Sequence, residues 1–131
     1  MSFPMPAQPR IYMSAQDHDR LERLVGDLPG AGVAGLLQQE LDRAVIVGDD
    51  RPARGAPLYR WLTYVDDRSD TPRRIQIVMP EDADIDAGKV SILSHVGAGL
   101  IGMAEGRTIA WTDPSGAQRR LTLMRIEDAG D

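Results

Sequence analysis

Residues 89–102 read Lys-Val-Ser-Ile-Leu-Ser-His-Val-Gly-Ala-Gly-Leu-Ile-Gly, and in this stretch a strand-like pattern changes directly into a helical one. The first five residues are mostly β-branched or apolar, which favours a strand. Ser94 is of a type that caps helix starts, and apolar side chains then repeat at helical spacing at Val96, Leu100 and Met103. The stretch therefore predicts a strand followed by a short helix over residues 94–103.

Further strand-like runs surround this stretch and are separated by turn residues. They cover residues 58–65, 74–79, 107–112 and 119–126. Asp113-Pro114-Ser115-Gly116 has the residue types of a type I turn and predicts a hairpin between the last two runs. Together these runs predict an α+β domain over residues 58–131, a mainly antiparallel sheet with one short helix.

The N-terminal third follows a helical period instead. Ser14 with Asp17 three residues later resembles a capping box, the sequence pattern of a helix start. Two apolar stripes at helical spacing follow, separated by Leu28-Pro29-Gly30-Ala31-Gly32. The stripes are Leu21, Leu24, Val25 and Leu28, and then Val33, Leu36, Leu37, Leu41, Ala44 and Val45. Residues 14–47 are therefore predicted to form a short antiparallel helical hairpin.

Two segments flank this hairpin. Residues 1–13 are predicted to be a leader that is partly disordered, with Ile11–Met13 as a short extended segment before Ser14. Residues 48–57 are polar and rich in Pro and Gly, which is typical of a linker.

Composition excludes several classes of function. The 131 residues contain no cysteine, so disulfide scaffolds, thiolate zinc sites and cysteine nucleophiles are excluded. The net charge of −5 and a pI of about 4.9 argue against a free-standing nucleic-acid binder. No apolar run approaches the roughly 20 residues of a membrane span. We expect a cytoplasmic protein of one domain, or of one domain with an appendage, and no cofactor. The sequence leaves the oligomeric state open and favours a monomer.

Motifs that suggest enzymatic or metal chemistry fail on their context. Gly97–Gly102 spells G-x-G-x-x-G, but too few residues follow for a dinucleotide-binding fold, and close approach of a helix to a sheet or a partner explains the glycines better. Glu81–Gly88 places its glycine one position late for a calcium loop, which favours a solvated acidic turn. His18 and His95, the only histidines, lie far apart in the predicted elements. We predict no catalytic residue and no metal site.

The same central stretch resembles the C-terminal domain of the GreA/GreB transcription factors. The resemblance rests on residues 89–102 and continues through Glu105-Gly106, Trp111 and Pro114-Ser115-Gly116. Residues 77–84 are also similar to the strand and acidic turn that precede this motif in the family. Residues 11–47, above all Glu40–Val47, look like the regulator of nucleoside diphosphate kinase (Rnk), a small Gre relative with a short hairpin.

The resemblance implies an FKBP-like C-terminal domain and docking on RNA polymerase beside its secondary channel. Two stretches depart from the family pattern: His95 stands where Gre factors have Pro, and Gly55–Leu58 replaces the usual approach to the first strand. Residues 14–47 hold six acids and three arginines, and a negative hairpin of this kind suits a channel lined with cationic groups.

The sequence thus favours a non-enzymatic transcription regulator that binds RNA polymerase as a protein partner. The resemblance and a Ser-capped helix start place the docking surface at Ser94, His95 and Val96, with Leu100 and Ile101 behind them. The expected hairpin tip is Asp27, Leu28, Pro29 and Gly30. One carboxylate at the tip is too few to help hold a catalytic Mg²⁺, so we expect no stimulation of transcript cleavage.

Two alternatives stay open. One is an FKBP-like peptidyl-prolyl isomerase or small-molecule binder, although a chain with 5% aromatic residues offers little aromatic lining. The other is a protein-interaction adaptor that affects nucleoside diphosphate kinase.

Overall fold

The computed structural model describes residues 11–27, 33–47, 55–69, 71–112 and 115–127. A two-stranded sheet and two helices form the N-terminal part: β1 (Tyr12–Ser14), α1 (Ala15–Gly26), α2 (Val33–Arg43) and β2 (Val45–Val47). The rest is built on β3 (Trp61–Asp66), β4 (Arg73–Val78), β5 (Lys89–Ser91), α3 (His95–Leu100), β6 (Thr108–Thr112) and β7 (Gln118–Ile126). Two single turns of 3-10 helix, η1 (Pro80–Asp82) and η2 (Ile85–Ala87), join β4 to β5.

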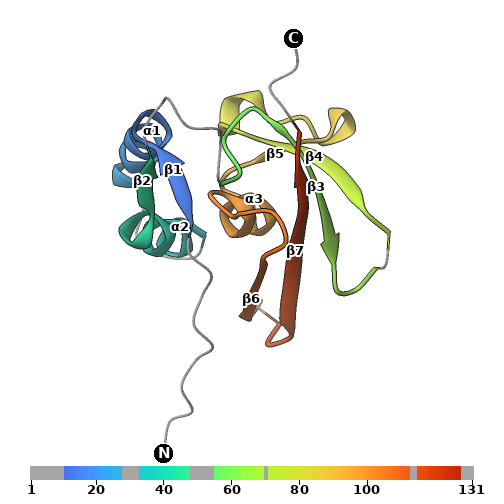
Figure 1. Cartoon of the computed structure of the whole chain (residues 1–131). Coiled ribbons are helices and arrows are strands. Elements are labelled where there is room, and N and C mark those ends of the chain that lie inside the picture. Colours follow the sequence, from blue (N-terminus) through green and yellow to red (C-terminus); the bar gives the residue numbers. More distant parts are fainter. Residues whose placement is uncertain (1–10, 28–32, 48–54, 70, 113–114, 128–131) are drawn as a thin grey trace, which may run out of the picture.

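The predicted α+β class is confirmed. Five strands form one sheet in the order β5-β4-β3-β7-β6, in which β4 and β5 are parallel and the other neighbouring pairs are antiparallel. Helix α3 lies between this sheet and the N-terminal helices (Figure 1). The predicted strands and the helix after Ser94 are present, with ends that differ by up to three residues. The acidic segment 81–87 is exposed, as the solvated turn required.

One hydrophobic core joins the two parts. Leu21 and Leu37 of the helices and Leu62 and Leu123 of the sheet are completely buried and belong to the same cluster as Leu100 and Ile101. Ile11 is also completely buried and pairs with Met103 in an isolated bridge. Each such side chain contributes about 1.5–3 kcal/mol by leaving water. The N-terminal part is therefore packed on the sheet domain.

The N-terminal end of the hairpin differs from the prediction. Tyr12 and Met13, expected as part of a short extended segment, form β1 together with Ser14, and β1 pairs in parallel with β2, a pairing that was not predicted. Residues 1–10 lie outside the described part of the chain. Ser14 Oγ accepts from Asp17 N at 3.1 Å, as a cap should, but the Asp17 carboxylate accepts from Leu58 N at 3.2 Å instead of reaching back to Ser14. The reciprocal half of a capping box is thus replaced by a bond to the sheet domain.

The C-terminal end of the hairpin also differs. Helix α2 ends at Arg43, so the prediction that Ala44 and Val45 continue its apolar stripe is wrong. The β-branched run Val45-Ile46-Val47 favours an extended chain, and it finds a partner in β1. His18 Nε2 lies 3.0 Å from Leu41 O, which brings the start of α1 to the end of α2. The connection at 28–32 is not among the described residues, so the hairpin itself stays a prediction.

The expected linker is only partly described, because residues 48–54 lie outside the structure's description. Ala56 is buried and hydrogen-bonded by its backbone to Met103 O and to Gly102 N, both at 2.8 Å. A Cβ on Gly55 would lie 2.3 Å from Gly102 O, so this glycine allows the close approach. Residues 55–57 are therefore packed against the end of α3.

Candidate functional site

The predicted docking residues lie where β5 passes into α3. Ser94 Oγ accepts from Gly97 N at 3.0 Å and donates to Ser91 O at 2.7 Å. Ser91 Oγ in turn accepts from Leu93 N at 3.0 Å. The two serines tie the turn to the end of β5, so the start of α3 is held rigidly. The predicted Ser94 cap is confirmed.

The five predicted site residues divide into two layers. Ser94, His95 and Val96 are half-buried, whereas Leu100 and Ile101 are completely buried. Val96 also packs in part against the core. Leu100 and Ile101 therefore support this surface from behind and are not exposed in it, and the accessible part is formed by the first three residues.

The glycines of α3 serve packing within the chain. A Cβ on Gly97 would lie 2.4 Å from Ser91 O and 3.0 Å from Ile92 Cα. The close approach predicted for this helix is therefore made to the chain's own β5, and no room is left at Gly97 for the backbone of a partner. Gly102 has a φ of +77° and a Cβ there would meet Ile11 at 2.9 Å. Gly97 and Gly102, two of the three glycines in the G-x-G-x-x-G pattern, thus serve tight packing.

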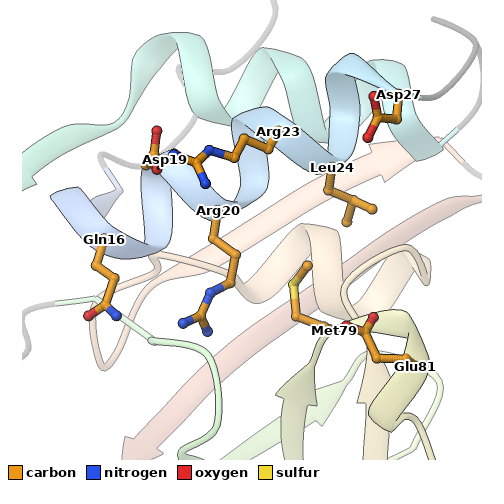
Figure 2. Close-up of a pocket in the computed structure, with 8 residues that line it drawn as sticks. All are labelled: Gln16, Asp19, Arg20, Arg23, Leu24, Asp27, Met79 and Glu81. Atoms are coloured by element: carbon orange, nitrogen blue, oxygen red, sulfur yellow. Dashed lines mark ion pairs between the residues drawn. The ribbon is translucent and has the colours of Figure 1, made fainter.

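A surface groove of about 540 Å³ lies between α1 and the end of β4 (Figure 2). Leu24 and Met79 project into the space between these elements and form its apolar floor (Figure 2). The rim is charged, with an ion pair of 3.0 Å between Arg23 and Asp19. The lining residues are Gln16, Asp19, Arg20, Arg23, Leu24, Asp27, Met79 and Glu81.

Tyr59 connects the two sides of this groove. Its hydroxyl donates to Asp82 Oδ2 at 2.5 Å and accepts from Met79 N at 3.3 Å. The Arg20 guanidinium lies over the Tyr59 ring, 6.0 Å from its centroid. Tyr59 has a φ of +62°, a left-handed conformation that costs a non-glycine residue roughly 1–2 kcal/mol. A tyrosine keeps this conformation only where the surrounding contacts hold it.

Among the described residues, four carboxyl groups have shifted pKa values, and three of them are those of Asp17, Glu40 and Asp66. Burial raises the pKa of Asp17, against the hydrogen bond from Leu58 N and the charges of Arg20 and Arg60. Burial also raises the pKa of Glu40, which is 3% exposed, and the nearby Arg43 opposes this rise. For Asp66 burial acts upward but is outweighed by hydrogen bonds from Arg68 N and Arg119, so its pKa is lowered.

The predicted tip is only partly described. Asp27 is exposed at the end of α1, where its N–H donates to Leu24 O at 3.2 Å. Leu28, Pro29 and Gly30 lie outside the described residues.

Within the described ranges, no three His, Asp or Glu side chains gather closely enough to hold a metal ion. His18 is engaged with Leu41 O and lies 3.6 Å from Glu22. None of the described helices has the length and apolar character needed to cross a membrane.

Comparison with known proteins decides the family. The model of the C-terminal part of the transcription elongation factors GreA/GreB matches residues 56–128, more than half of the chain. The chain belongs to the GreA/GreB family. A second model, the Rnk N-terminus, matches residues 9–47. The two matches cover the sheet domain and the β1–β2 part respectively, so this GreA/GreB member carries an Rnk-like N-terminal segment.

Individual relatives show the same division. A solved prokaryotic GreA/GreB factor from Nitrosomonas europaea is 31% identical, with a TM-score of 0.68 over 91% of this chain and 98% of that one. The regulator of nucleoside diphosphate kinase from Escherichia coli K12 is 26% identical over 92% of this chain and 91% of its own. GreA from Vibrio parahaemolyticus is 40% identical over 66 residues. This chain spans only 41% of the Vibrio protein's length.

Sequence reasoning missed two features of the site. The sequence did not indicate the left-handed backbone of Tyr59, because tyrosine is not a residue type that favours a positive φ. The groove brings the lining residues of α1 beside Met79, which lies 55 to 63 residues further along the chain, and no local sequence pattern can indicate such a contact.

Proposed function

We propose that the protein is a cytoplasmic, non-enzymatic transcription regulator that binds RNA polymerase near its secondary channel. The observation that carries the proposal is the intact Ser94-capped start of α3, within a domain that matches the GreA/GreB C-terminal part. The resemblance implies that the matching turn in Gre factors contacts a helical projection of the polymerase. We also propose the FKBP-like character of this domain on the same ground.

The groove extends the proposed docking surface. Ile92 N donates to Val78 O at 2.8 Å, so the strand end that carries Met79 lies beside the segment leading to Ser94. An apolar floor of Leu24 and Met79 under a charged rim suits an amphipathic helix, because methionine adapts its shape to a partner. A helical projection could therefore contact Ser94–Val96 and the groove together.

The N-terminal part supports the absence of cleavage stimulation. Helix α1 has 12 residues and is thus about 18 Å long at 1.5 Å per residue. The expected tip from Asp27 to Gly32 contains a single carboxylate in its sequence. A hard cation such as Mg²⁺ needs several converging oxygen ligands. Short reach and one carboxylate together leave this chain without the means to complete such a site.

Docking is tested by capture of the cognate core polymerase on immobilised protein. We expect Val96→Arg to weaken capture, while His95→Pro, which restores the family residue, is tolerated. His95→Asp should weaken capture if the facing polymerase surface is acidic. Ile85→Arg is the matched control, because Ile85 is 85% exposed on η2, away from α3.

Circular dichroism must first show that each variant is folded, since Val96 packs partly on the core. Unchanged capture by folded Val96→Arg would show that the start of α3 is not the docking surface. Cleavage is tested separately on backtracked complexes of the same polymerase. Release of short RNA fragments that depends on Asp27 would contradict the proposed absence of cleavage stimulation.

A second candidate function rests on one observation. The Escherichia coli relative, aligned over 92% of this chain, is named a regulator of nucleoside diphosphate kinase. An adaptor that acts on that kinase would alter its activity when the two purified proteins are mixed, with no polymerase present. The residues that line the described groove include no aromatic side chain, so this groove does not support the isomerase alternative.

A further inference from the structure

The outer face of the five-stranded sheet carries a cluster of cations. Leu62, Leu121 and Leu123 are buried toward α3, so their neighbours along each strand point to the opposite side. The pairing of Thr63 with both Arg74 and Arg125 places these two arginines on that side. The same alternation adds Arg120 and Lys89. The cationic face is Arg74, Lys89, Arg120 and Arg125.

This face is open. Helices α1, α2 and α3 all lie on the other side of the sheet (Figure 1). Between the cations the face presents Thr63, Thr108 and Thr122, the last two joined by their hydroxyl groups at 2.8 Å, and the half-buried Trp61 and Val65. The Arg74 guanidinium lies over the Trp61 ring, 4.2 Å from its centroid. Met124, at the bulge in β7, is its exposed large apolar side chain. The face therefore offers charges and hydroxyl groups around one aromatic ring.

Its charge is only partly compensated within the chain. Glu127 accepts from Arg74 at 2.6 and 3.0 Å, and these bonds with the charge of Arg125 lower the pKa of Glu127. Glu105 lies at the margin, where it accepts from Ile126 N. Arg120 and Arg125 form no ion pair with any carboxylate in the described residues. Lys89 is at the edge, beside the acidic segment 81–86.

We propose that this face binds single-stranded nucleic acid through its phosphates. The overall charge of −5 does not prevent this, because salt screens charges beyond about 10 Å at 0.1 M. The cations of the face favour an anionic partner, and an aromatic side chain such as Trp61 is of the type on which unpaired bases stack. Because the three helices lie on the other side of the sheet, none of them can enter a duplex groove from this face, whereas a single strand can lie along it. The proposal does not depend on polymerase docking, which involves the opposite side.

The test is fluorescence anisotropy with a fluorescein-labelled, 20-nucleotide single-stranded DNA. Contact of two to three phosphates predicts a slope of log affinity against log salt of about −1.4 to −2.1. Affinity should therefore fall about 7- to 18-fold between 50 and 200 mM salt. Arg120→Glu should weaken binding at 50 mM by about tenfold. Arg23→Glu makes the same charge change on α1, where its side chain is 80% exposed, and should have little effect.

Three results would overturn the proposal. The first is no binding of the oligonucleotide by the intact protein at 50 mM salt. The second is an equal loss of affinity in Arg23→Glu and Arg120→Glu, which would show that binding depends on the net charge of the protein and not on this face. The third is displacement of the oligonucleotide by polyglutamate at equal charge concentration, which would identify an acidic polypeptide as the occupant. Polymerase capture by Arg120→Glu should equal that of the unmodified protein, which separates this proposal from the docking proposal.

Discussion

Replacing Gly97 by alanine tests how closely α3 is seated on β5. The added Cβ would lie 2.4 Å from Ser91 O, 3.0 Å from Ile92 Cα and 3.2 Å from Ser91 C. All three are backbone atoms, and the hydrogen bond from Ile92 N to Val78 O at 2.8 Å fixes that segment on the sheet. The neighbours therefore cannot rotate away, and the helix itself must shift.

The size of the effect follows from two opposing terms. Alanine gains about 1 kcal/mol over glycine in helix propensity. Overpacking a well-packed core costs about 1–3 kcal/mol and occasionally more. Because the contacts involve backbone, we expect the upper part of that range to apply and a net loss of about 2 kcal/mol. For a chain of this size that corresponds to a fall in Tm of about 8 °C.

Gly26→Ala is the matched control. Gly26 is likewise a helical glycine, the last residue of α1, but a Cβ there meets nothing within 4 Å. Its substitution should raise stability by about 0.5 kcal/mol through propensity alone. Thermal and urea unfolding followed by far-UV circular dichroism measure both variants. If Gly97→Ala is as stable as Gly26→Ala, α3 does not rest on the β5 backbone and the packing explanation of its glycines is refuted.

Three further predictions concern polar contacts. Tyr59→Phe removes the bond to Asp82 and should lower the free energy of unfolding by about 1 kcal/mol in urea titrations, while Asp82→Asn, which keeps an acceptor, should cost less. Because the pKa of Asp66 is lowered, its pairing with Arg119 stabilises the fold at pH values above the unfolded-state pKa, and this stabilisation is lost as the pH falls. The difference in unfolding free energy between wild type and Asp66→Asn should therefore shrink below about pH 4. Because the pKa of Glu40 is raised, its contribution to the free energy of unfolding is largest below the unfolded-state pKa and is lost as the pH rises through the folded-state pKa. Glu40→Gln should therefore flatten that part of the curve of stability against pH. A steeper curve would contradict the argument that burial raises this pKa.

Much of the sheet domain could be predicted because its information is local. Alternating apolar residues such as Leu121 and Leu123 report one buried face, and both are completely buried. Ser94 is followed by helical spacing, and its cap is present. The acidic turn at 81–87 has no apolar pattern and is exposed. These elements depend on residues within a few positions of one another.

The N-terminal part was harder because its partners are distant. Val45 continues the helical spacing from Leu41, so a periodic pattern cannot show that the helix ends at Arg43. Val45 is the first residue of β2 and pairs with Tyr12 of β1, 33 residues earlier. Because the two strands are parallel, no tight turn joins them that the sequence could indicate. A glutamate such as Glu40 is typical of a solvated position on a helix, yet Glu40 is buried and forms an ion pair with Arg43 one turn away. Tertiary contacts decided each of these positions.

The proposed docking surface and the Rnk-like segment are mechanically connected through α3. Tyr12 N donates to Gly102 O and Ala56 N to Met103 O, both at 2.8 Å, so the end of α3 is bonded to both the N-terminal strand and the linker's end. The start of the same helix is bonded to β5 through Ser94. A six-residue helix held at both ends cannot move one end without the other. Any partner that binds at Ser94–Val96 therefore meets a surface whose position is set by both halves of the chain.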